Sequence, residues 1–454
     1  MISFLISITA LIIGYFTYGK FVERVFGIDK NRETPAERLR DDVDYLPLPT
    51  WRIFLIQFLN IAGLGPIFGA IAGAMFGPSA FLWIVLGSIF AGAVHDYLSG
   101  MLSLRHDGLS ISEVVGVYLG PYMKHFMRLF TIVLLIFVGT VFLMGPAKII
   151  DEMTGNMWNL WVWVGVILAY YVLSTLLPIN KVISKIYPVF GLAMLFMAIG
   201  LLIALFFGDY SIPEIVPDNL RNMTKDPNKT PLFPILFVTI ACGAISGFHA
   251  TQSPLMARCI KNETLGKRVF YGTMITEGIV ALIWAAAAMT FFGNVDLLND
   301  AMFANSGNAA WAANEISTNM LGKFGGLLAL LGIVAAPITS GDTAFRSARL
   351  ILADVFKTDQ KKILNRLYLS IPLFIVAFIL TQVDFGIIWR YFAWSNQTLA
   401  TVVLWTITAY LTYSKKNYWI TLIPSIFMTM VCSTYILIAP EGFELGNTLS
   451  YIWG

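Results

Sequence analysis

Ionisable side chains inside long apolar stretches are the residues of this sequence that could do chemistry. His95 and Asp96 are adjacent in one stretch, His249 and Glu277 lie in two others, and Asp342 lies in a fourth. A charge near the centre of a bilayer costs at least about 2.5–3.5 kcal/mol on insertion scales, so each group requires a structural or functional reason. Imidazoles and carboxylates can carry protons, and carboxylates with hydroxyl oxygens can bind a hard cation such as Na⁺.

Each of these groups also has a structural interpretation. Asp342 and Arg346 are four residues apart and could form an ion pair on one helix face. Asp96 could cap a helix or form an ion pair near the cytoplasmic face, and His249 could be a hydrogen-bonded packing residue. Alternatively, Asp342 carries a proton or binds a cation, Asp96 relays protons with His95 beside it, and His249 contacts a substrate or a proton.

The sequence contains no motif for catalysis, for metal binding by cysteines or for nucleic-acid binding. There is no metalloprotease, Walker or nucleophile-elbow motif, so neither an enzyme nor a cofactor is predicted. Cys242, Cys259 and Cys432 are far apart without metal-ligand spacing, and we interpret them as buried thiols rather than metal ligands. No basic tract with interleaved aromatic residues indicates a nucleic-acid partner.

The elements that must position these groups are transmembrane helices. Hydrophobic residues make up 57% of the 454 residues and charged residues 13%, with a mean hydropathy of +0.73, whereas a soluble domain carries about 25% charged residues. A helix needs about 20 apolar residues to cross a bilayer, where the backbone has no other hydrogen-bond partner. Twelve such stretches are predicted: 2–19, 53–77, 79–103, 126–147, 157–177, 184–207, 232–256, 269–292, 325–345, 366–382, 387–411 and 418–438.

The basic residues predict how these helices are oriented. If the loop after the first span is cytoplasmic, it and every second loop after it, with their flanks, hold 24 of the 30 Lys and Arg residues. Cytoplasmic loops carry an excess of such residues. We therefore expect a multi-pass protein of the bacterial inner membrane, in contact with lipid, with both termini outside the cytoplasm. The first cytoplasmic loop, 27–50, is either a solvated segment or part of a gate.

Two of the predicted spans contain helix-breaking residues. Gly63, Gly65 and Pro66 lie near the middle of the second span, and Gly243 and Gly247 near the middle of the seventh. Proline removes a backbone donor and glycine loosens a helix, so both spans are expected to unwind there. The alternative is that the glycines only allow helices to pack closely.

The positions of the two breaks predict an internal repeat. The broken spans are five apart, an odd number, so the second copy crosses the membrane in the opposite direction. We expect a single membrane domain, 1–454, with repeats at 51–207 and 232–411 and additional spans within 1–50 and 412–454. Paired interrupted spans of this kind indicate the binding site of a secondary transporter. A channel or a membrane nutrient sensor are the alternatives.

Candidate sites follow from the breaks and the intramembrane polar residues. The candidate substrate site comprises Ala62, Gly63, Gly65, Pro66, Gly243, Ser246, Gly247, His249, Gln252 and Asn396. The candidate ion or proton site comprises His95, Asp96, Thr339, Ser340, Asp342 and Thr343. We expect His249→Ala and Asp342→Asn each to abolish coupled uptake in a folded protein.

Several segments of the sequence resemble one family of membrane transporters, the carbon starvation protein A family. The resemblance extends over nearly the whole chain, and the I-A-C-G-A-I-S-G-F-H string is its most specific part. The matching segments are D-V-D-Y-L-P at 42–47, I-A-G-L-G-P at 61–66, F-A-G-A-V-H-D at 90–96, I-A-C-G-A-I-S-G-F-H at 240–249, K-N-E-T at 261–264, S-G-D-T-A-F-R-S-A-R at 340–349 and S-N-Q-T-L-A at 395–400.

The resemblance implies a transporter with H⁺ or Na⁺ coupling. The family is linked to peptide uptake and includes pyruvate–proton symporters, and it is similar to the amino acid–polyamine–organocation superfamily with its five-plus-five repeat. The substrate would lie between the breaks at 62–66 and 242–249, and a cation or proton between spans two and nine. This chain is short for the family, and it departs from the family pattern at His95, where many members have Gln, and at Leu64, where they have Ala. Peptide import is the leading expectation, with pyruvate–proton symport as the alternative.

Overall fold

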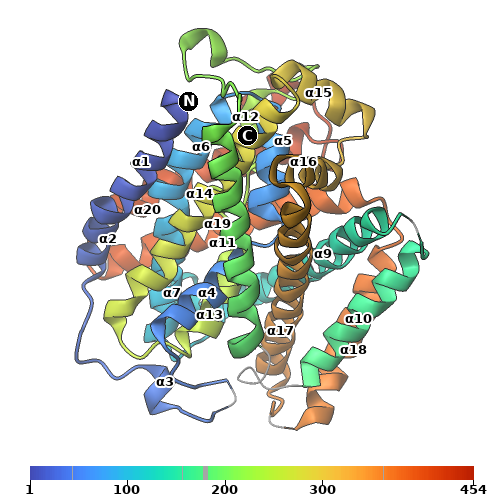
Figure 1. Cartoon of the computed structure of the whole chain (residues 1–454). Helices are drawn as coiled ribbons and strands as arrows, with labels where there is room; N and C mark the ends of the chain where they lie inside the picture. The colour runs from blue at the N-terminus through green and yellow to red at the C-terminus, as the bar shows by residue number, and fades with distance from the viewer. Residues whose placement is uncertain (43, 156, 177–182, 361) are drawn as a thin grey trace.

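The computed structural model describes residues 1–42, 44–155, 157–176, 183–360 and 362–454, without the side chains of 176, 183–186 and 323–330. All regular structure in these residues is helical (Figure 1). Most of the helices run along one common direction, as expected for a chain whose backbone must satisfy its own hydrogen bonds in lipid.

The helices have the following bounds. The α-helices are α1 (Ile2–Phe16), α2 (Tyr18–Phe26), α3 (Pro35–Arg38), α4 (Thr50–Ile61), α5 (Ala70–Ala74), α6 (Ser79–Gly87), α7 (Ala93–Arg105), α8 (Ile111–Leu119), α9 (Pro121–Met153), α10 (Leu160–Leu176), α11 (Ile183–Phe207), α12 (Leu232–Thr239), α13 (Gly247–Ala257), α14 (Gly272–Phe291), α15 (Val295–Ala304), α16 (Ala309–Ala329), α17 (Ala336–Phe356), α18 (Ile363–Leu380), α19 (Phe385–Tyr413), α20 (Trp419–Ile438) and α21 (Asn447–Trp453). Wider π-helical turns are η1 (Gly65–Gly69), η2 (Ser88–Gly92), η5 (Lys267–Tyr271) and η6 (Leu330–Ala335), and short 3₁₀ turns are η3 (Pro217–Asn219) and η4 (Glu263–Leu265).

Seven helical segments in the described part of the chain are long and apolar enough to cross a membrane. They are Ile2–Phe26, Ser79–Arg105, Pro121–Met153, Tyr187–Phe207, Glu263–Phe291, Ile363–Leu380 and Trp419–Ile438. The pair Thr50–Ile61 and Gly65–Ala74, bent by 55°, makes an eighth if it counts as one span, and Leu160–Thr175 is apolar but shorter. The protein is therefore a multi-pass, all-helical membrane protein.

The other predicted spans contain helices with interruptions or many polar groups. The span predicted at 232–256 is divided between α12 and α13, that at 325–345 includes η6 and the start of α17, and that at 387–411 lies within α19. Because polar residues and breaks lower their apolar character, these segments are not among the seven, and the count of twelve spans stays a prediction.

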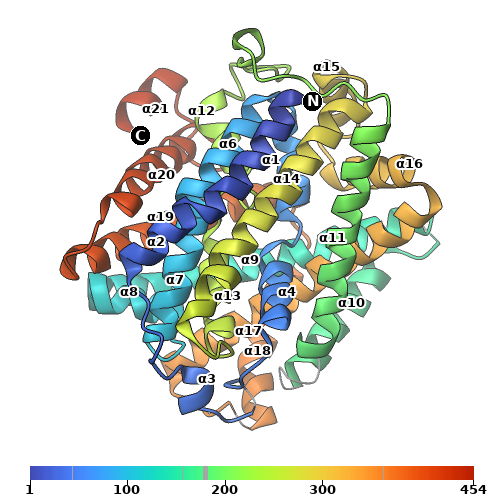
Figure 2. The same cartoon turned by 60° about the vertical axis from the view of Figure 1, so that its left-hand side comes forward.

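Both chain termini lie at the same end of the bundle, opposite α3 (Figures 1 and 2). The Met1 ammonium donates to Glu214 at 2.5 Å, and the side chain of Asn447 donates to the carbonyl of Asn228 at 3.0 Å. Hydrogen bonds from this ammonium and from Ser3 lower the pKa of Glu214 to about 2. The segment 208–231 thus holds both ends of the chain.

The first loop covers the opposite end of the bundle. Arg38 forms an ion pair with Asp107, and the Tyr45 hydroxyl donates to the Asp107 carbonyl at 2.9 Å. Beside them, Arg105 donates twice to the fully buried carboxylate of Glu263, with both distances 3.0 Å. The described part of loop 27–50 therefore contacts the helix ends, although most of its residues are exposed, and the choice between a solvated segment and part of a gate stays a prediction.

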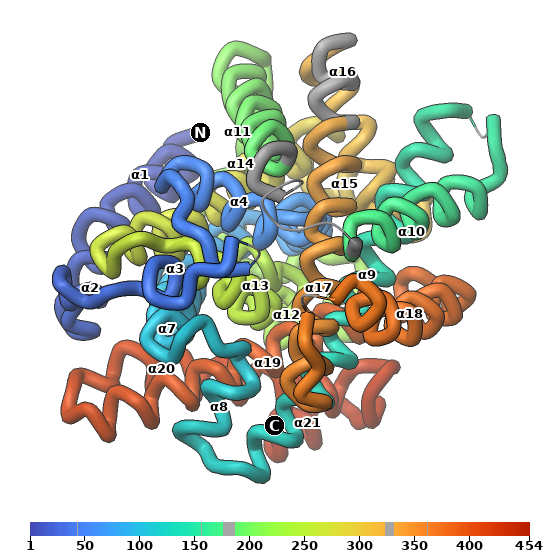
Figure 3. The backbone as a smooth tube through the Cα atoms, turned by 90° about the horizontal axis from the view of Figure 1, so that it is seen from below, coloured from blue at the N-terminus to red at the C-terminus, as the bar shows by residue number. Residues whose placement is uncertain are grey.

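Outer helices expose apolar side chains and inner helices are buried. On α18, Ile371, Ile375 and Ile379 are exposed at a spacing of one turn, which gives the helix a lipid-facing stripe. Seen from the α3 end, α4, α12 and α13 lie near the middle of the molecule, whereas α10 and α18 lie at one edge (Figure 3). The ionisable candidates are consequently on helices that do not face lipid.

Candidate functional site

The first predicted break is present in the structure. Helix α4 ends at Ile61, the three residues 62–64 are not helical, and η1 begins at Gly65. Pro66 lies in the first turn of η1, where a backbone N–H would have no partner within the helix, so the missing N–H of proline costs no hydrogen bond. A side chain at Gly65 would collide with the side chain of Cys242, so a glycine is required where the two broken segments meet.

The second predicted break is also present, between Thr239 at the end of α12 and Gly247 at the start of α13. Asn396 of α19 bridges it, because its side-chain oxygen accepts from the Phe248 amide at 2.6 Å and its amide donates to the Ser246 hydroxyl at 3.0 Å. A side chain at Gly247 would collide with the Asn396 backbone. Together, these contacts fix the N-terminus of α13 against α19 inside the bundle.

Four ionisable side chains form one chain of contacts beside this break. The Asp96 carboxylate bonds to Nδ1 of His95 at 2.8 Å with one oxygen and to Nδ1 of His249 at 2.8 Å with the other. Nε2 of His249 lies 3.4 Å from the carboxylate of Glu277 on α14. All four side chains are fully buried. Three separate helices therefore contribute to a connected set of proton-binding groups.

Several atoms of this cluster have unused hydrogen-bonding capacity. Nε2 of His95, Nε2 of His249 and both carboxylate oxygens of Glu277 are buried and have no hydrogen-bond partner. Buried polar groups are nearly always paired, and each exception requires an explanation. Here the explanation can be a proton, a substrate group or an ion that completes the site.

Asp342 on α17 has a different environment. Its carboxylate accepts hydrogen bonds from the Ser174 and Tyr187 hydroxyls, both at 2.6 Å. Two residues before Asp342, the Ser340 hydroxyl donates to the Leu59 carbonyl of α4 at 2.9 Å. The polar groups described around Asp342 are thus hydroxyls together with the guanidinium of Arg346, which donates to the Ser174 carbonyl at 3.3 Å. The adjacent helix is the first broken span.

The remaining predicted site residues are buried beside these two centres or belong to the backbone of a break. The hydroxyls of Thr339 and Thr343 donate to carbonyls of their own helix, those of Ala336 and Ser340. Gln252 lies one turn after His249, and its amide donates to Thr251 at 2.8 Å and to Ser347 at 3.4 Å. Buried positions without a described side-chain bond are Ala62, Gly63, Pro66 and Gly243.

The structure regroups the predicted residues. The sequence assigned His249 to the substrate site and His95 and Asp96 to the ion site, but all three belong to one network. It also adds residues that the candidate sites lacked, namely Glu277, Cys242, Ser174 and Tyr187. Glu277 was recognisable as an intramembrane charge. A serine, a tyrosine and a cysteine in apolar helices give no such signal.

The fold and the buried polar centres define a class of protein, the helical membrane proteins with interrupted spans. A manganese transporter of Eremococcus coleocola has a similar fold, with a TM-score of 0.55 and 13% identity over 91% of this chain and 94% of the transporter. The family model for "Carbon starvation protein CstA" matches residues 1–173 and 147–387. The chain belongs to the carbon starvation protein A family.

Relatives of this chain match it along different lengths. An uncharacterized membrane protein of Haemophilus influenzae is 42% identical over 67% of this chain and 95% of its own length. The peptide transporter CstA of Campylobacter jejuni is 25% identical over 98% of this chain and 82% of its own. The pyruvate/proton symporter BtsT of Escherichia coli is 27% identical over 62% of this chain, which spans about half of that symporter (48%).

Proposed function

We propose that this protein is a secondary active transporter that imports peptides by alternating access, coupled to H⁺ movement. The observation that carries the proposal is the buried chain of contacts from His95 through Asp96 and His249 to Glu277. It lies beside the second break, where a transporter of this architecture is expected to bind its substrate. Relatives named as peptide transporters and as a proton symporter support the same class of activity.

The composition of the cluster favours H⁺ over Na⁺ as the coupling ion. Two imidazoles and two carboxylates can share, gain and lose protons, whereas a sodium ion prefers a shell made of oxygen atoms. The unpartnered atoms of His95, His249 and Glu277 are available to hold such a proton. A bound proton also offsets the charge of an anionic substrate group in a low-dielectric interior.

The second break offers recognition of a carboxylate. Helix α13 has 11 residues and begins inside the bundle, where the Phe248 amide donates to the Asn396 side chain at 2.6 Å and the His249 amide donates to the Ser246 carbonyl at 3.3 Å. Such an N-terminus favours an anion. A peptide presents its terminal carboxylate, and we place this group at the second break, where movement of the Asn396 side chain would free the Phe248 amide to bind it.

Pyruvate is a second candidate because it shares the carboxylate and because BtsT, a relative, is a pyruvate/proton symporter. The full burial of His249, Glu277 and Ala62 favours a compact substrate in the state described here. In this candidate the same α13 N-terminus and the same proton-binding groups act on a smaller molecule.

The proposal includes the topology that such a transporter needs. We place twelve spans in the inner membrane, with a five-plus-five inverted repeat and both termini outside the cytoplasm. The shared position of the termini at the end opposite loop 27–50 supports an even number of crossings. The two breaks at 62–64 and 240–246 support the repeat.

The test is uptake into proteoliposomes containing the full chain. We expect a radiolabelled dipeptide to accumulate under an inward proton gradient, to stop accumulating with a protonophore, and not to accumulate with His249→Ala. His125→Ala, at an exposed position, is the matched control and should transport normally. Accumulation of pyruvate instead supports the second candidate, and accumulation driven only by a sodium gradient contradicts H⁺ coupling. Binding without accumulation indicates a sensor, and flux without saturation indicates a channel.

A further inference from the structure

We propose that Cys242, His249 and Glu277 form a binding site for a divalent transition-metal ion. One ligand atom of each, the thiol sulfur, an imidazole nitrogen and a carboxylate oxygen, lie within 4.8 Å of one another. Within the described part of the chain, this is the one group of three His, Cys, Asp or Glu residues with such geometry. The proposal goes beyond transport, because it assigns a ligand that neither a peptide carrier nor a pyruvate carrier requires.

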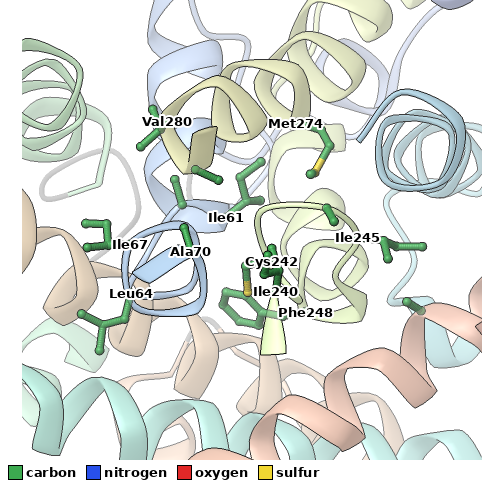
Figure 4. Close-up of a cluster of buried hydrophobic side chains, with 14 of the residues drawn as sticks. Ile61, Leu64, Ile67, Ala70, Ile240, Cys242, Ile245, Phe248, Met274 and Val280 are labelled. Carbon is green, nitrogen blue, oxygen red and sulfur yellow. The ribbon is translucent and has the colours of Figure 1, made fainter. Parts of the chain in front are cut away.

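The distances suit a small ion after minor adjustment. A four-coordinate zinc-like ion has bonds of about 2.0–2.3 Å, which places neighbouring ligand atoms roughly 3.5 Å apart. Nε2 of His249 already lies 3.4 Å from Glu277. The Cys242 sulfur needs to approach these two atoms by about 1 Å, within the reach of a side-chain rotation. Figure 4 shows Cys242 beside Phe248, on the side of the second break that faces Leu64 and Ala70 of the first.

The free atoms of the cluster point to a ligand in a second, independent way. Nε2 of His249 and both oxygens of Glu277 have no hydrogen-bond partner although both side chains are fully buried. The other ring nitrogen of His249 is bonded to the Asp96 carboxylate at 2.8 Å. Metal-binding histidines usually have this arrangement, in which a carboxylate fixes the ring and directs the opposite nitrogen to the metal.

The set of donor atoms decides which ions fit. A sulfur, a nitrogen and a carboxylate oxygen favour borderline ions such as Zn²⁺, Co²⁺ or Fe²⁺ over Mg²⁺ and Ca²⁺, which prefer oxygen ligands alone. Binding requires the thiolate, so the Cys242 proton leaves to solvent as the metal enters. Three protein ligands leave one coordination position open, as in sites that also bind a small molecule.

Cobalt titration of the full chain in detergent tests the proposal without any transport measurement. After removal of metals with a chelator, we expect one Co²⁺ per chain, with the visible absorption of a four-coordinate ion and a near-ultraviolet thiolate-to-cobalt charge-transfer band. Zn²⁺ should displace the cobalt and abolish both signals. Asp96→Asn should weaken affinity about 10–100-fold, because the ring of His249 loses its anchor.

The cysteine variants assign the sulfur ligand. Cys242→Ser should abolish the charge-transfer band. A Cys259→Ser/Cys432→Ser double variant keeps Cys242 as its one cysteine and should show the band at full strength. The double variant therefore assigns the sulfur ligand even if Cys242→Ser does not fold. The proposal is overturned if the wild-type chain binds no stoichiometric Co²⁺, or if the band is lost in the double variant. Because these signals need no substrate, a failed uptake assay leaves the metal site standing, and absent cobalt binding leaves the transport proposal standing.

Discussion

Two buried acidic centres, at Asp96 and at Asp342, differ in what surrounds them. Asp96 bonds to two imidazoles and connects through His249 to a second carboxylate, Glu277. The described partners of Asp342 include the hydroxyls of Ser174 and Tyr187. We propose that the first centre moves protons and that the second holds a fixed charge or a hard cation.

The glycines of the first break connect the two centres. A side chain placed at Gly63 would come within 3.3 Å of the Ser340 hydroxyl, and one placed at Gly65 would meet Cys242. Movement of this non-helical segment would therefore change both centres at once. We propose that in this transporter the group that titrates and the group that holds a fixed charge are separate and are coupled through this backbone segment.

The largest effect is expected at the imidazole centre. Asp96→Asn should abolish proton-driven accumulation and its dependence on pH, because both hydrogen bonds lose their charged acceptor, one oxygen is replaced by an amide donor, and a bond to a charged group is worth about 1.5–3 kcal/mol. That corresponds to a reduction of at least about 100-fold in coupled uptake. Uptake into proteoliposomes at several external pH values measures it, with the exposed Asp300→Asn as control. Normal proton-driven uptake by Asp96→Asn would remove this centre from the coupling mechanism.

A smaller and different effect is expected at the hydroxyl centre. Asp342→Asn should lower uptake about tenfold or more, a smaller loss than the abolition expected from the sequence, because both hydroxyls bond to one oxygen, Oδ2, which a carboxamide can keep while it loses the charge. The remaining uptake should respond to pH as in the wild type, which is the feature that separates it from Asp96→Asn. Ser174→Ala, which removes one of the two bonds, should have an intermediate effect. If Asp342→Asn loses its pH response, the two centres act as one.

The smallest effect is expected at the contact between α17 and the first break. Ser340→Ala removes the bond to the Leu59 carbonyl, which is worth about 1 kcal/mol, and should lower uptake about fivefold with a small decrease in the thermal unfolding temperature. Thr343→Ala is the matched control, because its hydroxyl donates to the Ser340 carbonyl within its own helix. Equal effects from both variants would mean that the link to the break has no special importance.

The helix breaks are the part of the site that local sequence predicts well. Gly63, Gly65 and Pro66 disfavour a continuous helix whatever surrounds them, and α4 ends directly before them. Gly243 and Gly247 predict the second break for the same reason. The membrane class and the helical fold also follow from the sequence, because lipid leaves the backbone few alternatives.

The partners of each polar side chain were decided only by the tertiary structure. Asp96, His249 and Glu277 come from three helices separated by long stretches of chain, and neither spacing nor composition indicates that they meet. The sequence alone determined that this chain crosses a membrane in helices, two of them interrupted, with a few buried charges. Which charges face an imidazole, a hydroxyl or a thiol depends on how the helices pack, since a contact between distant segments is set by the three-dimensional arrangement and leaves no local pattern.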